Sequence, residues 1–187
     1  LPFYHETLEA QLVDTQEYPL NALTQRPMAM YHSWDSQNAW LRQIHTHNYL
    51  FMSPQLGASQ GFEDGDWVWV ESPHGKVRCM ARFSESVEPG TVWTWNAIGK
   101  AAGAWALHPK ANESQKGFLL NHIIAEELPP CEAGAHLSNS DPVTGQAAWF
   151  DVRVKVYKAA DNEPQATFPQ FRPQRRTPGQ GGRRGKW

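Results

Sequence analysis

Cysteine is scarce in this chain of 187 residues: Cys79 and Cys131 are the only two. They stand too far apart in the sequence to form a paired CxxC metal site, and two cysteines do not make a disulfide framework. We therefore expect both to be structural thiols. With 40% apolar residues and nine Trp, the chain is long enough to bury the core of one globular domain.

Long apolar runs are also missing. None approaches the roughly 18 residues that a helix needs to cross a bilayer, and the N-terminus lacks the charged-then-apolar pattern of a signal peptide. We expect no membrane-embedded segment. Because the chain begins at Leu1 rather than Met, we also expect it to be a fragment of a longer protein.

Acidic residues are absent after Glu163, whereas six of the 17 basic residues follow it. The body keeps 11 basic against 19 acidic residues, a net charge of about −8, which is a poor surface for nucleic acid. The tail at 161–187 is rich in Pro, Gln, Gly and Arg and cannot pack independently. We interpret it as disordered or as an arm that wraps a partner, and 1–17 as a lead-in from a preceding domain.

Short strands separated by tight turns dominate 18–160. Ser53 as N-cap, Pro54 as first helical residue and Gly61 as C-terminal cap predict a short helix, and 38–45 has the apolar spacing of an amphipathic helix. We expect strands at 19–23, 49–52, 67–71, 76–83, 91–95 and within 147–159. Because short helices recur between strands, the pattern favours a small mixed β-barrel over a sandwich.

Three further patterns bear on the surface of this domain. In the strand at 76–83 apolar residues alternate with Lys76, Arg78 and Arg82, which predicts one core face and one polar face. The stretch 99–115 lacks periodicity and is typical of a long loop, often a functional feature. The pair His45 and His47 lacks a third nearby ligand, so surface or partner-facing roles are favoured over metal binding.

The stretch "YPLNALTQRPMAMYHS" (18–33) begins as a buried strand but ends in an unusual number of hydrogen-bonding groups. Thr24 and Ser33 can donate to phosphate oxygens, and Arg26 can make a bidentate, charge-assisted contact. A simpler interpretation stays open for each, in which Thr24 and Ser33 form turns and Arg26 is a solvent-exposed charge. Asn121, within the apolar run "GFLLNHII", could likewise be a loop cap.

Three segments in a fixed order carry a resemblance: 18–33, then "GFEDGDWVWVESPHGKVRCMARFSESVEPGTVW", then "DPVTGQAAWFDVRVKV". Together they resemble the C-terminal dinucleotide-binding domain of the dimethyl sulfoxide reductase family of molybdenum enzymes. The resemblance covers about 19–159. It implies a mainly β fold with short helices, a six-stranded double-psi β-barrel, that closes over two molybdopterin guanine dinucleotides.

The resemblance also implies a set of cofactor-binding residues. A dinucleotide with a pyrophosphate and a pterin offers many acceptors and some donors, so hydroxyls, amides and a cation suit it. The residues carried over are Thr24, Arg26, His32, Ser33, Trp34, Asn96, Asn121 and Phe150. No catalytic residue and no metal ligand can be assigned in this chain, because in the family the ligand of molybdenum or tungsten lies in preceding segments.

The resemblance implies further partners as well. One partner is the rest of the catalytic subunit, which carries an iron–sulfur cluster. The others are an iron–sulfur electron-transfer subunit and a membrane anchor. Nucleic acid is not expected as a partner. The stretch "WNAIGKAAGAW" favours the branch that acts on small inorganic sulfur compounds, with sulfite preferred. A cytoplasmic location is favoured, with attachment to the membrane through partner subunits, while a periplasmic location stays open.

Three alternatives remain at this point. A formate dehydrogenase would share the same cofactor domain. A stand-alone double-psi barrel could serve as a binding module that uses the basic tail as an electrostatic arm, and it would bind nucleic acid in a salt-dependent way. The third is a structural domain that has lost contact with the cofactor.

Overall fold

The chain is seen here as a computed structural model. The structure describes residues 3–4, 6–31, 38–45, 47–96, 98, 108, 117–134, 136–141, 143–147, 152–163 and 170–171. The long stretch at 99–115 therefore lies outside the described residues except for His108, and so does most of the tail.

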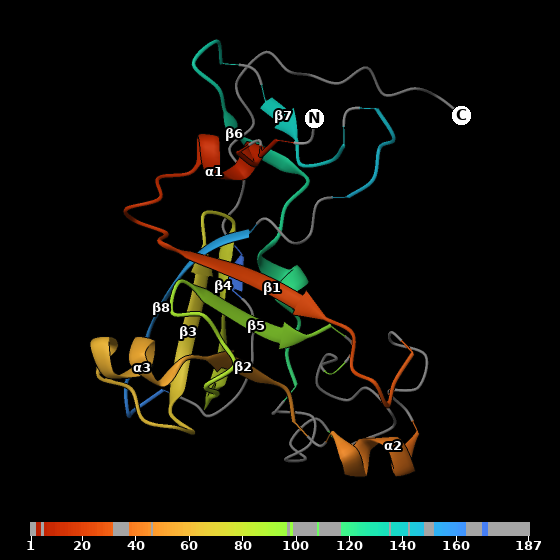
Figure 1. Cartoon of the computed structure of the whole chain (residues 1–187), viewed down its shortest axis with the longest axis vertical. Helices are drawn as coiled ribbons and strands as arrows, with labels where there is room; N and C mark the ends of the chain where they lie inside the picture. Colours follow the sequence, from red (N-terminus) through yellow and green to blue (C-terminus); the bar gives the residue numbers. More distant parts are fainter. Residues whose placement is uncertain are drawn as a thin grey trace.

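Six strands close into a barrel (Figure 1). Their hydrogen-bonded order is β2-β5-β1-β8-β3-β4, and an additional pairing of β2 with β4 completes the ring. Two pairs, β1 with β5 and β2 with β4, are parallel, and the others are antiparallel. The strands are β1 (Leu20–Gln25), β2 (Tyr49–Met52), β3 (Trp67–Ser72), β4 (Gly75–Phe83), β5 (Thr91–Trp95) and β8 (Val152–Lys158). The predicted fold class is confirmed.

The barrel interior is filled by the alternate residues of these strands. Every second residue of β8 is buried, beginning at Val152, and β1, β2 and β5 alternate in the same way. Burial of these apolar side chains supplies the main stabilisation of the fold, at about 25 cal/mol per Å² removed from water. Fully buried members include Ala22, Leu50, Val77, Val92 and Val154.

Arg78 lies on the predicted polar face of β4 but is buried there. It is only 4% exposed, whereas Lys76 is half-buried and Arg82 is exposed. Trp69 of β3 and Glu163, which follows β8, lie against it. The alternation of β4 assigned Arg78 to the outer face of the barrel, but it could not show that distant residues cover this face.

The two predicted helices are present. In α3 (Pro54–Gln60) the hydroxyl of Ser53 accepts a hydrogen bond from Leu56 N at 3.0 Å, and Gly61 ends the helix at φ +72°, a region that L side chains rarely adopt. Inside α3, Gly57 lies directly against the ring of Phe83, which leaves no room for a side chain. This contact presses α3 against the end of β4.

The helix α2 (Ala39–Ile44) is capped by Asn38, whose side chain accepts from Trp40 N and Leu41 N. Two of its apolar residues, Trp40 and Ile44, do not face the barrel core. Trp40 is 78% exposed and Ile44 is 63% exposed, and α2 lies below the barrel in Figure 1. An amphipathic pattern therefore predicted the helix correctly without identifying what its apolar side contacts.

Several short elements had no sequence signal strong enough to predict. The helix α1 (Leu8–Leu12) lies in the expected lead-in and packs beside β6, with Glu9 buried. The others are η2 (Leu120–Ile123), β6 (Glu127–Pro130), β7 (His136–Ser138) and β9 (Gln170–Phe171), which pairs with β4. Within the described ranges, no helix is both long and apolar enough to cross a membrane.

Candidate functional site

Two threonines face each other where the parallel strands β1 and β5 end. Thr24 pairs in register with Thr94, and both side chains are buried. The ladder continues past the strands, because Asn96 N donates to Gln25 O at 2.9 Å. Polar residues thus replace apolar ones inside this end of the barrel, and they sit beside the loops that follow β1 and β5.

Thr24 and Asn96 each bury an oxygen that is not used within the described part of the chain. Neither Thr24 Oγ1 nor Asn96 Oδ1 has a hydrogen-bond partner there. A buried polar atom without a partner costs about 1–3 kcal/mol, so native proteins rarely keep one without a reason such as a ligand. Both residues belong to the predicted cofactor-binding set, and their chemistry fits a ligand with phosphate oxygens and amide-like edges.

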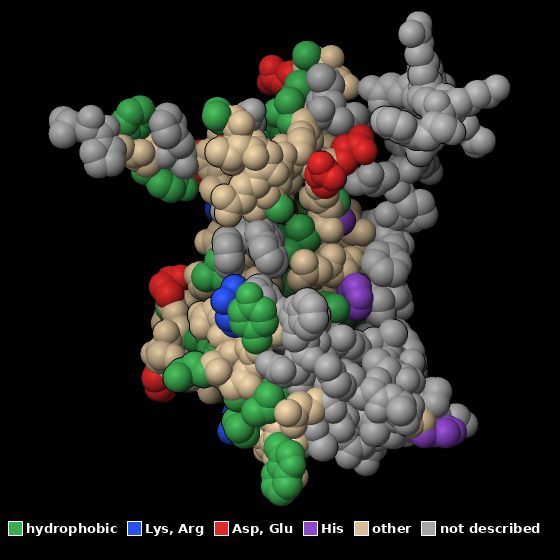
Figure 2. Space-filling view, turned by 90° about the vertical axis from the view of Figure 1, so that its right-hand side faces the viewer, with side chains coloured by type: hydrophobic (Ala, Val, Ile, Leu, Met, Phe, Trp, Pro, Cys, Tyr) green, Lys and Arg blue, Asp and Glu red, His purple; other side chains and the backbone are tan. Residues whose placement is uncertain are grey.

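Arg26 adds a positive charge to this end of the barrel. It directly follows β1 and is exposed, with its guanidinium carbon 5.6 Å from the centre of the Tyr31 ring. The body of the protein is acidic overall. A cation at this position nevertheless favours an anionic ligand locally. Figure 2 shows few Lys or Arg side chains among the described residues of the face that it presents.

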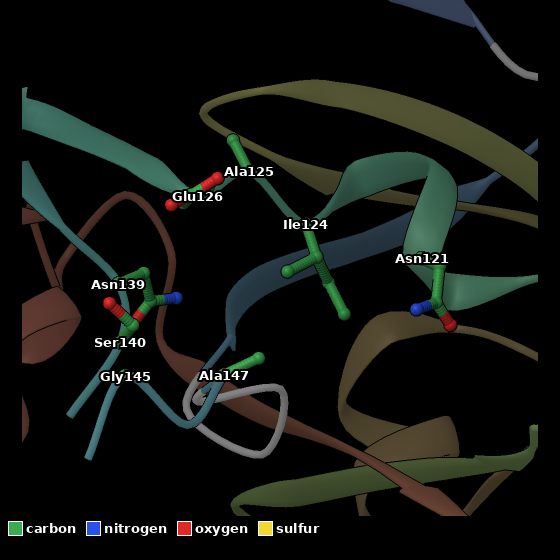
Figure 3. Close-up of a pocket in the computed structure, with 8 residues that line it drawn as sticks. All are labelled: Asn121, Ile124, Ala125, Glu126, Asn139, Ser140, Gly145 and Ala147. Carbon is green, nitrogen blue, oxygen red and sulfur yellow. The ribbon is translucent and has the colours of Figure 1, made fainter.

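Asn121 is presented by the short helix η2. Its neighbours Phe118, Leu120 and Ile123 are buried in the core, while Asn121 itself is exposed. It lies at one side of a cavity of about 480 Å³ (Figure 3). The other residues that line this cavity are Ile124, Ala125, Glu126, Asn139, Ser140, Gly145 and Ala147.

Asn139 and Ser140 were missed as potential site residues because their stretch has the composition of a turn. The stretch does form a turn: Asp141 accepts hydrogen bonds from Thr144 N and Val143 N, and these hold the pKa of Asp141 below its usual value. Asn139 Nδ2 also donates to the buried Glu9 at 3.4 Å. That contact joins residues 130 positions apart, so no local pattern could predict it.

His45 and His47 each lie beside an aromatic ring. His45 lies 5.5 Å from the Trp95 ring and His47 lies 5.8 Å from the Tyr49 ring, centre to centre. Burial lowers the pKa of His45 and of His122, which favours their neutral form at pH 7. The residues that the structure describes contain no group of three or more His, Cys, Asp or Glu that could hold a metal ion.

Cys79 is a structural thiol, as expected. It is buried, and burial raises its pKa, which makes it unreactive. Cys131 is half-buried and forms no disulfide.

The predicted cofactor-binding residues fall into three groups. Thr24, Arg26 and Asn96 gather at the ends of β1 and β5, and Asn121 lies on η2. The other four, which lie outside the described residues, are His32, Ser33, Trp34 and Phe150. The binding role of all eight stays a prediction.

Several known proteins are similar to this chain. A sulfite dehydrogenase subunit of Allochromatium vinosum is 78% identical over all 187 residues, which make up 19% of that protein. A putative dimethyl sulfoxide reductase catalytic subunit of Halobacterium salinarum is 28% identical over 89% of the chain and 17% of its own length. The chain thus spans about a fifth of each of these relatives.

The fold has a counterpart in a solved structure, acetylene hydratase from Pelobacter acetylenicus. The two superpose with a TM-score of 0.62 at 21% sequence identity, over 85% of this chain and 21% of the other. At that identity the likeness shows the fold alone. Residues 20–139 match the family described as "Molydopterin dinucleotide binding domain". Since this match covers more than half of the chain and the expected barrel is present, the chain belongs to the molybdopterin dinucleotide binding domain family.

Proposed function

We propose that this chain is the cofactor-binding domain of a molybdenum or tungsten oxidoreductase that oxidises sulfite. The observation that carries the choice of substrate is the 78% identity, along the whole chain, to part of a sulfite dehydrogenase. The bound ligand would be molybdopterin guanine dinucleotide, two copies per metal atom. When bound, the metal and its pterins supply the redox chemistry; the barrel binds and orients them.

The buried groups at the end of the barrel fit this ligand. The hydroxyl of Thr24 can donate to a phosphate oxygen, and the amide of Asn96 has an acceptor and donors for a pterin edge. Arg26 would add a charge-assisted contact to the pyrophosphate. These roles account for the buried Thr24 and Asn96 oxygens that have no partner in the described part of the chain.

The remainder of the catalytic subunit is the proposed partner of the exposed apolar side chains. Met28, Tyr31, Trp40 and Ile44 are all more than 60% exposed and come from 28–44, directly after β1. Hydrophobic side chains also reach the lower edge of the face in Figure 2. Exposed apolar patches commonly mark interfaces. We propose that this remainder carries the iron–sulfur cluster. A membrane anchor and an iron–sulfur subunit are the further proposed partners.

The first experiment is a composition measurement on the full-length polypeptide that contains this chain. We expect molybdenum or tungsten, iron, and about two guanine nucleotides per metal atom. Addition of sulfite should then reduce the enzyme, since oxidation to sulfate takes an oxygen atom from water and releases an electron pair. Formate would be tested in parallel.

Each result decides between the proposals. Reduction by formate and not by sulfite would replace the proposed substrate and keep the cofactor. An intact, carefully purified protein with neither metal nor nucleotide would contradict the proposed function. Salt-dependent binding to nucleic acid would then be examined for the stand-alone binding module.

A further inference from the structure

Two buried polar side chains hold the segment that carries Asn121. Asn48 Nδ2 donates to Phe118 O at 2.8 Å, just before η2. Ser72 Oγ donates to Ile123 O at 2.5 Å, at the last residue of η2. Asn48 is 1% exposed and Ser72 is fully buried. The segment is therefore attached to the barrel at both ends through its own backbone.

Asn48 also ties this segment to the end of β5. Its second amide hydrogen is donated to Trp95 O at 2.9 Å, and its oxygen accepts from the Thr94 hydroxyl at 2.8 Å and from Trp95 N at 3.3 Å. A side-chain amide has two N–H donors and an oxygen with two lone pairs. All are engaged, so Asn48 is suited to link chain segments and not to contact a ligand.

Ser72 makes a comparable link on the other side. Its hydroxyl oxygen accepts a hydrogen bond from His74 N at 3.1 Å while donating to Ile123 O. The turn between β3 and β4 is thereby joined to the end of η2. Hydrogen bonds in such a dry environment restrain geometry strongly, because breaking one leaves buried groups without partners.

These links matter because η2 cannot hold Asn121 by itself. A 3₁₀ helix of four residues has poor hydrogen-bond geometry and no independent stability. Its N-cap residue, Leu119, makes no side-chain capping hydrogen bond. The orientation of Asn121 therefore depends on the buried apolar neighbours and on Asn48 and Ser72.

We propose that Asn48 and Ser72 are positioning residues for Asn121: they hold the backbone on both sides of it, and Asn48 joins that backbone to the end of β5, next to Asn96. This inference rests on the proposed function, because Asn121 is taken to contact the dinucleotide. It assigns a role in cofactor retention to two residues that do not touch the cofactor themselves.

The test uses the full-length polypeptide with its bound cofactor. Ser72→Ala and Asn48→Leu are each compared with the matched control Ser53→Ala. Ser53 is also a buried serine in a hydrogen bond to backbone, but it caps α3, away from η2. The readouts are the half-time for loss of guanine nucleotide after dilution and the midpoint of thermal unfolding.

We expect Ser72→Ala and Asn48→Leu to shorten nucleotide retention about three- to tenfold, the range that one net hydrogen bond implies. Ser53→Ala should lower the unfolding midpoint to a similar degree and keep the wild-type retention. A general loss of stability would shorten retention in the control as well, so the contrast separates positioning from stability.

Coupling to Asn121 gives the decisive comparison. In an Asn121→Ala background, adding Ser72→Ala should change retention no further, although it should still lower the unfolding midpoint. Such non-additivity is the sign that Ser72 acts through Asn121. Losses of retention that simply multiply in the double variant would overturn the inference, as would Ser72→Ala behaving like Ser53→Ala.

Failure of the proposed function looks different. If the unmodified protein carries no guanine nucleotide, then the proposed function and this inference both fail. If it does carry nucleotide and Asn121→Ala leaves retention unchanged, the role of Asn121 is wrong and the inference falls alone. A shorter retention in Asn121→Ala with no effect of Ser72→Ala also overturns only the inference.

Discussion

Arg78 lies against the indole of Trp69, with its guanidinium carbon 4.9 Å from the ring centre. Trp69 Nε1 donates to Glu163 Oε2 at 2.8 Å, and the same oxygen is 3.6 Å from Arg78. The three residues come from β4, β3 and the segment after β8. Their contacts explain how a cation is accommodated in a buried position on the outer face of the barrel.

Replacing Arg78 should therefore weaken the barrel. We expect Arg78→Met to lower the free energy of unfolding by about 1–2 kcal/mol, because the cation–π contact is lost from a largely dry position. The matched control is Arg82→Met on the same strand, because the ion pair between Arg82 and Asp64 is exposed. This substitution should lower the free energy of unfolding by less than about 0.5 kcal/mol. Denaturant unfolding measures both, and equal effects would contradict the distinction.

Acid should destabilise the chain through two carboxylates. The hydrogen bond from Trp69 holds the pKa of Glu163 below its ordinary value of 4.5, and the hydrogen bond from Lys158 holds the pKa of Asp66 below 3.8. A depressed pKa in the folded state stabilises the fold above the unfolded pKa, and the effect is lost as pH falls through the folded pKa.

The expected outcome is an unfolding midpoint that decreases from about pH 6 towards about pH 3, with a shallower decrease in Glu163→Gln and Asp66→Asn. Thermal unfolding at a series of pH values measures it. Glu85→Gln is a control, because Glu85 is exposed and forms no ion pair with another described residue. The explanation would be wrong if the wild type and all these variants shared one pH profile.

Thr24→Val should weaken cofactor binding without lowering the stability of the fold. The substitution removes a buried hydroxyl that has no partner in the described part of the chain, so the chain should keep its stability or gain up to about 1 kcal/mol. In the full-length protein it should shorten nucleotide retention. Thr94→Val is the control, because it removes the hydroxyl that donates to Asn48 and should destabilise. A loss of stability in Thr24→Val equal to that in Thr94→Val would contradict the prediction.

Trp40→Gln should leave the fold intact and weaken association with the remaining domains. Because Trp40 is mostly exposed, the free energy of unfolding should change by less than about 0.5 kcal/mol. A buried Trp at an interface commonly contributes about tenfold or more in affinity. The measurement is the affinity of this chain for the rest of the catalytic subunit, produced separately. Val143→Ser is the control, since Val143 is 90% exposed and lies in the turn that follows β7 in the chain. Equal affinities for wild type and Trp40→Gln would exclude α2 from the interface.

The strands and helix caps could be predicted from the sequence because local physics determines them. Alternation in β8, the Ser53 cap and the positive φ of Gly61 all depend on residues within a few positions of each other. The prediction of strand β1 began one residue early and ended two residues short of Gln25. Thr24 and Gln25 continue the strand because β5 supplies backbone partners for them.

The candidate site could be predicted only in part. Thr24 and Asn96 were identified by their chemistry and by resemblance, but nothing local indicated that their oxygens would be buried without partners. Asn48 and Ser72 were not singled out at all, since an Asn before a strand and a Ser in a turn are ordinary. Their partners lie 70 and 51 residues away.

Alternation, turn chemistry and the order of the motifs were thus enough to predict the barrel strands, the turns between them and the family. Tertiary packing decided that Arg78 is buried, that Trp40 and Ile44 of α2 are exposed, and that Asn48 joins β5 to η2. Burial and hydrogen-bond saturation depend on residues that folding brings together from distant parts of the chain, and no local pattern contains that information.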